Sequence, residues 1–305
     1  MGYQLKIDVS PVYDLLGSFM VYTTKKWIRN LDIGMNWLTE VESSLPADAH
    51  QSLIQAAQWP FEDYDVLYVW AIQRTKDEGI TAFLDDLAHA KESTLFEAVR
   101  KYIPSLSYEN AVRIRNQYVP LLHLWYENYF RHVESSITAL IEEDASEKKS
   151  LLHKMDPEPL IEYASGGVVI EPNPSIREVV LFPTVHIRPI NMYSFCEEML
   201  LIQYPVDVAE SNEEEPPKVL LRLTHALAEP DRLRLLRYVA DEPKSLTDMI
   251  RDLNKPEEML IHHLLMLRAA GLLRTHLTHG DVEKFSIRPD GAAELQMFLE
   301  TYIHQ

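Results

Sequence analysis

Residues 226–236, ALAEPDRLRLL, and residues 263–273, HLLMLRAAGLL, decide the fold of the C-terminal part of this 305-residue chain. In the first stretch, Pro230 is suited to the first turn of a helix with an apolar side. In the second, Gly271 is suited to the left-handed conformation that ends many helices. The apolar spacing then changes from a helical period to a period of two, which predicts that a short β ribbon follows.

The residues between these stretches predict two further helix boundaries. Ser245 is a good N-cap for a helix over residues 246–253, and Asp248, three positions on, can reach back to the cap. Residues 254–257 form a tight turn that leads into a third helix. Its leucines recur at i, i+4 and i+7, so we expect a buried face made of Leu260, Leu264 and Leu267.

Alternating apolar positions from Leu272 to Ile287 predict two strands, with His279-Gly280-Asp281 as the turn between them. Pro289 then introduces a last amphipathic helix. Three helices, a two-stranded ribbon and a final helix therefore fill residues 218–305, which we predict to be one domain.

Over these landmarks the chain resembles the ArsR-type transcriptional repressors, which are winged helix-turn-helix proteins. The resemblance covers the C-terminal third of the chain, and the upstream part is not assigned to a known family. It implies double-stranded DNA as the partner, a third helix that reads the major groove, and a homodimer built with the last helix. The residues expected to form the dimer contact are Leu295, Phe298, Leu299 and Tyr302.

The candidate DNA-binding residues lie on the third helix, on the ribbon and close to both: Arg251, Lys255, Met259, Ile261, His262, Arg274, Thr278, His279 and Lys284. The outward face of the third helix is unusual, because it also carries Glu257 and Glu258, which repel phosphates, and few side chains that can read a base edge. The sequence therefore leaves two functions open. One is a DNA-binding transcriptional regulator, expected to be a repressor; the alternative is a winged helix that serves as a protein-interaction or dimerisation module with little DNA binding.

Composition limits what the rest of the chain can be. The net charge is −18, of which residues 218–305 carry only −1, so the acidity belongs to the upstream part. An acidic upstream part would have to point away from a DNA duplex. A DNA-binding domain with almost no net charge would bind DNA weakly in salt. The N-terminus has no signal peptide and the chain has no long apolar run, so we expect a cytoplasmic protein without membrane association.

The upstream part predicts a mainly α-helical fold with three segments. Residues 1–152 show helical periodicity and form an expected α-helical domain, the candidate sensor of a small-molecule or protein effector. Residues 153–208 are rich in turn residues and short apolar runs, which predicts a small antiparallel sheet. Residues 209–217 are expected to be an acidic, proline-containing linker into the winged helix.

Motifs for catalysis are missing from the sequence. It contains no glycine-rich phosphate loop, nucleophile elbow or His-Glu-x-x-His helix. The histidines of the C-terminal third lack the cysteine and carboxylate partners that a metal sensor would use. Cys196 is the single cysteine. We therefore expect no enzyme activity, no catalytic residues, no bound metal and no cofactor.

Overall fold

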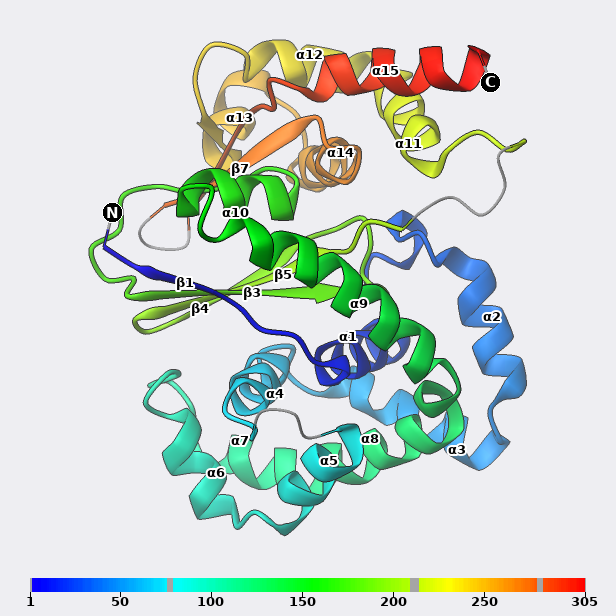
Figure 1. Ribbon diagram of the computed structural model, residues 1–305, viewed down its shortest axis with the longest axis vertical. Helices are drawn as coiled ribbons and strands as arrows, with labels where there is room; N and C mark the ends of the chain where they lie inside the picture. The colour runs from blue at the N-terminus through cyan, green and yellow to red at the C-terminus, as the bar shows by residue number, and fades with distance from the viewer. Residues whose placement is uncertain (1, 76–78, 209–213, 279–281, 305) are drawn as a thin grey trace. The chain divides into compact units, whose positions relative to one another are not determined.

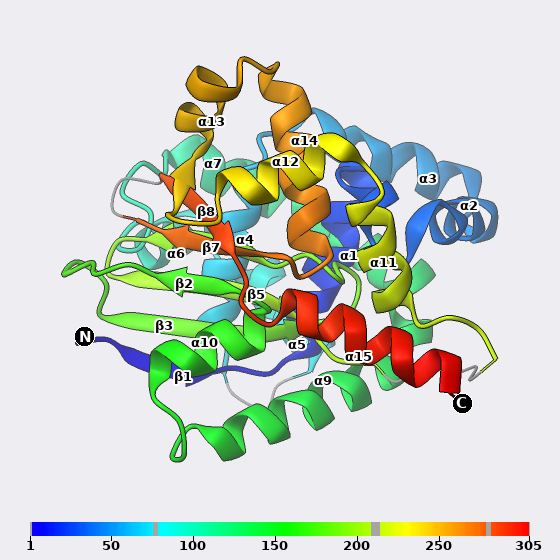
Figure 2. The same ribbon diagram turned by 90° about the horizontal axis from the view of Figure 1, so that it is seen from above.

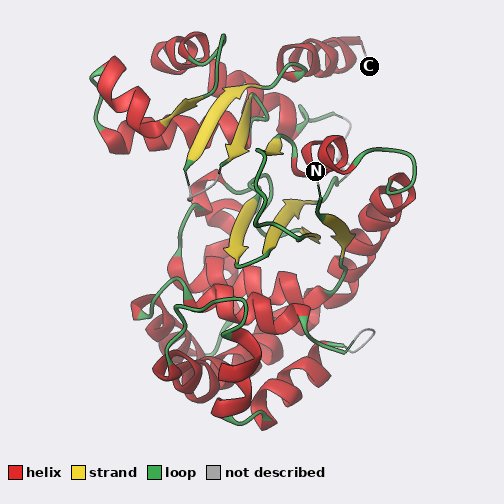
Figure 3. Cartoon of the chain, turned by 90° about the vertical axis from the view of Figure 1, so that its left-hand side faces the viewer, coloured by secondary structure: helices red, strands yellow, loops and turns green. Residues whose placement is uncertain are grey.

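The computed structural model describes residues 2–75, 79–208, 214–278 and 282–304. The chain is mainly α-helical and forms two compact units. One unit comprises Gly2–Ser150 and Ser175–Val206; the other comprises Leu151–Pro174 and Asp207–Gln305, and it contains the helix-turn-helix. Figure 1 shows the elements along the chain and Figure 3 marks the strands of the two sheets.

The helices of the first unit fill most of residues 11–151. Their bounds are α1 (Pro11–Thr24), α2 (Gly34–Ser44), α3 (Ala47–Leu53), α4 (Asp63–Ile72), α5 (Ile80–His89), α6 (Glu92–Val99), α7 (Tyr108–Arg113), α8 (Val119–Trp125) and α9 (Arg131–Leu151). Short 3₁₀ turns lie at Ile28–Asn30 and Ile54–Gln58. In Figure 1, α1 and α4 lie against the sheet of this unit, and α5 and α8 lie beyond them.

The strands of this unit are β1 (Gln4–Ile7), β3 (Glu178–Thr184), β4 (Met192–Cys196) and β5 (Met199–Pro205), in the order β1-β3-β5-β4. The pairs β1–β3 and β3–β5 are parallel, and β4–β5 is antiparallel. The antiparallel sheet expected over residues 153–208 is therefore wrong, and Val168–Ile170 of that segment belongs to the other sheet. The sheet is mixed, and it recruits β1 from the N-terminus because a parallel neighbour can come from far along the chain.

Residues 108–151 form one continuous but irregular helix. Two π-helical segments, Ile114–Tyr118 and Tyr126–Phe130, interrupt it, and Pro120 is the second residue of α8, which follows the first segment. π-helical turns are rare and change which side chains face a neighbour. The second segment carries Tyr129, whose hydroxyl lies 2.6 Å from Nε2 of His186.

A buried polar network lies in the core of this unit. Asp14 is fully buried on α1 and accepts hydrogen bonds from the backbone N–H groups of Val185 and His186. Its other carboxylate oxygen lies 2.6 Å from Nδ1 of His186. Nε1 of Trp37 donates to the Tyr129 hydroxyl at 2.7 Å. These polar groups are therefore satisfied by one another, as burial requires.

The second unit contains α10 (Pro157–Ser165), α11 (Lys218–Leu227), α12 (Pro230–Tyr238), α13 (Leu246–Leu253), α14 (Glu257–Ala269) and α15 (Gly291–His304). Its strands are β2 (Val168–Ile170), β6 (Lys244–Ser245), β7 (Leu273–Leu277) and β8 (Glu283–Ile287). Figure 2 shows these helices with β7 and β8. The predicted ribbon is part of a four-stranded sheet, in the order β2-β7-β8-β6.

One core holds the second unit together. Leu260, Leu264 and Leu267 are buried, as the spacing predicts, together with Leu235, Met249 and Phe285. Leu295 and Phe298 of α15 pack against the same core. Of the predicted linker 209–217, residues 209–213 lie outside the described residues. Among the described helices, none combines the length and apolar character that a membrane span requires.

Candidate nucleic-acid interface

The α13–turn–α14 arrangement is fixed by local sequence. The Ser245 hydroxyl accepts the N–H of Asp248 at 3.2 Å, and the Asp248 carboxylate accepts the N–H of Ser245 at 3.1 Å. This is the predicted capping box at the start of α13. Asn254 ends α13 with φ of 50°, a left-handed conformation that asparagine tolerates. Pro256 then precedes α14, so that the two helices are joined by a tight turn.

The face of α14 opposite the core is exposed. Met259 has 37% of its surface exposed and Ile261 has 48%, and Glu257, Glu258 and His262 are also exposed. These outward positions are therefore solvent-facing, whereas Leu265, which the leucine spacing also places outward, is half-buried. This face offers two carboxylates, two apolar side chains and one imidazole, and no arginine, asparagine or glutamine that could read a base edge bidentately.

Arg251, on α13, is held by two acids. Its guanidinium lies 2.7 Å from a carboxylate oxygen of Asp252 and 3.1 Å from one of Asp248. Hydrogen bonds from Arg251 and from the Tyr238 hydroxyl lower the pKa of Asp252 to about 2. The acid is therefore ionised at neutral pH, and it competes with phosphate for the arginine.

Lys255, in the turn before α14, is held in the same way. Its Nζ lies 3.0 Å from Asp231, which also pairs with Arg234 at 2.6 Å. Hydrogen bonds from Lys255 and from Arg234 lower the pKa of Asp231. Because exposed ion pairs of this kind are weak, a phosphate can replace the carboxylate, but the exchange reduces the net gain.

The hairpin formed by β7 and β8, which we call the wing, carries the remaining candidate DNA-binding residues. Nε of Arg274 on β7 lies 2.5 Å from Glu162 of α10, so this cation is bound within its own unit. Lys284 on β8 is exposed, and the described residues give it no ion-pair partner. The Thr278 hydroxyl donates to the Val282 carbonyl at the base of the wing turn. His279 lies outside the described residues.

The predicted dimer residues divide into two groups. Leu295 and Phe298 pack against the core of their own unit, because α15 lies along α11. Tyr302 is half-buried, and its hydroxyl donates to the Glu214 carbonyl at 3.4 Å. Leu299 has 41% of its surface exposed and Ile303 has 63%, and residues four apart on a helix share a face. Leu299 and Ile303 therefore form an exposed apolar pair on one face of α15, and Ile303 was not predicted.

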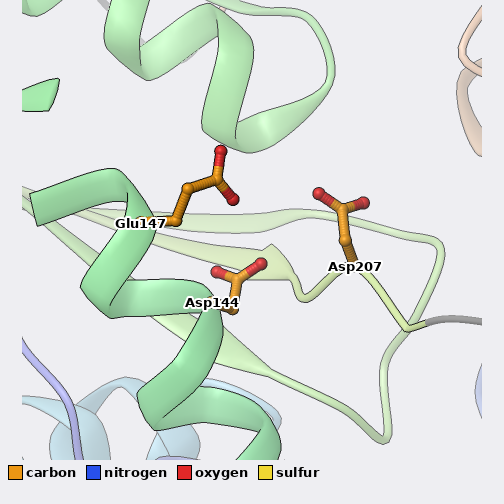
Figure 4. A group of neighbouring side chains, drawn as sticks. All are labelled: Asp144, Glu147 and Asp207. Atoms are coloured by element: carbon orange, nitrogen blue, oxygen red, sulfur yellow. The ribbon is translucent and has the colours of Figure 1, made fainter. Parts of the chain in front are cut away.

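Figure 4 draws a group of carboxylates outside this region: Asp144 and Glu147 of α9, and Asp207. Asp144 is paired with Lys148, one helical turn on, at 2.7 Å. Asp207 belongs to a different unit from the other two residues. We therefore assign no metal to these acids.

The capped α13, the tight turn, the exposed α14 face and the β7–β8 hairpin define a winged helix-turn-helix. This class of protein binds DNA by placing the second helix of the pair in the major groove. Residues 229–275 match the family model of the bacterial regulatory proteins of the arsR family. The C-terminal part of the chain therefore carries an ArsR-family helix-turn-helix, the signature of a DNA-binding regulator. No curated protein and no solved structure matches the chain significantly.

Proposed function

We propose that this protein is a transcriptional repressor that binds double-stranded DNA through α14 and the β7–β8 wing. The observation that carries the proposal is the exposed face of α14. This helix follows α13, which has a capping box at its start, and both helices lie within the segment that matches the arsR family. In this arrangement α14 enters the major groove and the wing approaches the adjacent phosphates. The function involves no catalysis, and such a protein acts in the cytoplasm.

Affinity for random DNA is low under this proposal. Lys284 is exposed on the wing, whereas Arg251 and Lys255 must leave carboxylates before they can contact phosphates. Because the salt dependence of binding scales with the number of phosphates neutralised, the slope is shallow. An electrophoretic mobility assay at low and moderate salt, with duplexes selected from genomic fragments and with random duplexes, tests this. Failure to retard any duplex at low salt would falsify the repressor function.

The active form is a homodimer in which α15 packs against α15 of a second copy. Leu299 and Ile303 supply exposed apolar surface, and Leu221 on α11, next to α15, is 51% exposed. A dimer places two recognition helices at two half-sites, so that two weak contacts act together. The unit formed by Gly2–Ser150 and Ser175–Val206 senses a small-molecule or protein effector in this scheme.

A second function is favoured by the same α14 face. Met259 and Ile261 are exposed apolar side chains beside two acids, and a protein partner suits this surface better than a phosphate backbone does. On this alternative the winged helix is an interaction module with little DNA binding. Ile261→Asp then abolishes association with the partner, and Glu257→Gln leaves DNA binding unchanged.

The repressor proposal predicts the opposite response to Glu257→Gln. Removing a negative charge from the outward first turn of α14 lowers repulsion of the phosphates, so DNA binding becomes tighter. The matched control is Glu300→Gln on the exposed surface of α15, which changes the net charge equally. Equal DNA affinity of the two variants favours the interaction module.

A further inference from the structure

Strand β2 comes from a segment far upstream of the winged helix, yet it belongs to the wing sheet. It pairs in parallel with β7, with Val168 opposite Thr275 and Ile170 opposite Leu277. The N–H of Thr275 donates to the Gly167 carbonyl at 2.8 Å, and the N–H of Glu171 donates to the Leu277 carbonyl at 3.0 Å. Strand β2 thus occupies the edge of β7 that β8 does not pair with.

Two side-chain contacts fasten the ends of this pairing. Before β2, Glu162 of α10 pairs with Arg274 at 2.5 Å. After β2, Glu171 lies 2.8 Å from Nδ1 of His276, whose Nε2 lies 2.8 Å from the Ser286 hydroxyl on β8. The residue opposite His276 on β8 is Lys284. The contacts of β2 therefore continue across β7 to the strand that carries the exposed lysine.

Gly167 allows β2 to come this close. Its φ is +128°, and a Cβ at this position would lie 2.9 Å from the Leu273 carbonyl oxygen. Thr275 and Leu277 are buried, so the backbone groups that they direct to β2 would lose their partners if β2 withdrew. The pairing is therefore costly to break and depends on a glycine.

On both sides of β2, the chain leads into the unit formed by Gly2–Ser150 and Ser175–Val206, which we call the upstream unit. On the N-terminal side, α10 follows α9, which belongs to the upstream unit through Ser150. On the C-terminal side, the chain returns to that unit at Ser175 and forms β3. A rearrangement of the upstream unit thus has two covalent routes to β2, and through β2 to the wing.

We propose that β2 is the element through which the upstream unit controls the wing. When β2 is paired with β7, the β7–β8 hairpin is ordered for contact with DNA; when β2 is displaced, the wing loses order and DNA affinity falls. This inference rests on the proposed function, whose regulation it describes. It names the β2–β7 strand pairing as the link between the upstream unit and the winged helix.

The test compares Gly167→Ala with Gly166→Ala in the full chain. Both glycines have positive φ, but a Cβ at Gly166 meets nothing within 4 Å. Only Gly167→Ala therefore places a methyl group that clashes with β7. We expect Gly167→Ala to weaken binding of a random-sequence duplex at low salt by about fivefold or more, a typical lower bound for coupled sites. We expect Gly166→Ala to bind as the unmodified chain does.

Amide hydrogen exchange shows whether the pairing is the cause. In Gly167→Ala the amide of Thr275, which donates to β2, exchanges faster, and the amide of Thr278, which donates to Val282 within the hairpin, also exchanges faster because the hairpin loses order. Coupling is reciprocal, so addition of the duplex to the unmodified chain slows exchange at the Glu171 amide. Val169→Pro, with Val169→Thr as its control, removes an N–H of β2 and serves if Gly167→Ala does not fold.

The outcomes separate the two proposals. If the unmodified chain binds the duplex and Gly167→Ala binds it equally although Thr275 exchanges faster, control through β2 is wrong and the repressor function stands. Protection of Thr275 that survives in both Gly167→Ala and Val169→Pro also overturns control through β2, because β7 would then not depend on it. If the unmodified chain does not bind the duplex, the repressor function fails and the control of DNA binding fails with it.

Discussion

Asp231→Asn is the most direct test of whether internal acids limit DNA binding. Asp231 holds Lys255 at 3.0 Å and Arg234 at 2.6 Å, and asparagine keeps the shape of the side chain while it removes the charge. Each cation that then contacts a phosphate steepens the slope of log affinity against log salt by about 0.9. Over a fourfold range of salt, that is an additional loss of affinity of about 3.5-fold for one contact and about twelvefold for two.

The assay is fluorescence anisotropy with a labelled duplex across a salt titration. Asp241→Asn is the matched control, because Asp241 is exposed, lies in the same unit and has no ion-pair partner among the described residues. A general effect of net charge raises affinity in both variants by a similar factor, whereas release of Lys255 and Arg234 steepens the slope in Asp231→Asn alone. Identical slopes in the two variants would show that these cations do not reach DNA.

Three further predictions concern the stability and assembly of the winged helix. Ser245→Ala removes the capping box of α13 and costs about 1 kcal/mol of unfolding free energy, measured by urea denaturation; a loss below about 0.3 kcal/mol contradicts the capping role. Burial lowers the pKa of His263, so the winged helix loses stability as pH falls below about 6.5. His263→Gln flattens this pH dependence, measured by thermal unfolding at a series of pH values. An unchanged profile refutes the role of His263. We expect Ile303→Asp to convert the proposed dimer to monomer in light scattering, and Met297→Asp, on another face of α15, to leave it a dimer; equal behaviour of the two variants refutes the proposed α15 contact.

The winged helix could be predicted from the sequence because its signals are local. The Ser245–Asp248 pair, Pro230 at the first turn of α12 and Gly271 with φ of 69° each fix a helix end within a few residues. The spacing of the leucines in α14 then decides which face is buried. Such features depend on near neighbours, so the exposed residues of α14 follow from spacing alone.

Contacts over long sequence distances could not be predicted in the same way. β2 is only three residues long and pairs with a strand more than a hundred residues later, and nothing in Val168–Ile170 specifies that partner. The parallel pair β1–β3 and the hydrogen bonds between Asp14 and His186 have the same character. Partners in parallel sheets and buried polar networks are chosen by tertiary packing, which a single sequence does not encode locally.

Of the ion pairs that hold the candidate cations, the sequence indicates only one. Asp252 is the immediate neighbour of Arg251, so an ion pair there could be anticipated, whereas Asp231 reaches Lys255 only because α12 packs near the turn. The last helix shows the same limit. Its apolar residues predict a covered face, but only packing reveals that Leu295 and Phe298 cover their own core and that Leu299 and Ile303 remain exposed.

If the protein represses transcription as a dimer, the exposed end of α15 compensates for the weak DNA binding that the ion pairs around α14 cause. A single winged helix must exchange carboxylates for phosphates at Arg251 and Lys255, so its affinity for any one half-site is low. Two winged helices joined through Leu299 and Ile303 bind the second half-site as an intramolecular event, which raises the overall affinity by about 10² to 10⁴ without a new contact. Weak single contacts also release random DNA quickly, so only paired half-sites at the correct spacing retain the protein. On this argument Ile303→Asp lowers affinity for a selected operator far more than it lowers affinity for random DNA, whereas Asp231→Asn changes both in proportion. A uniform loss for Ile303→Asp on both duplexes would show that specificity resides in the α14 contacts themselves.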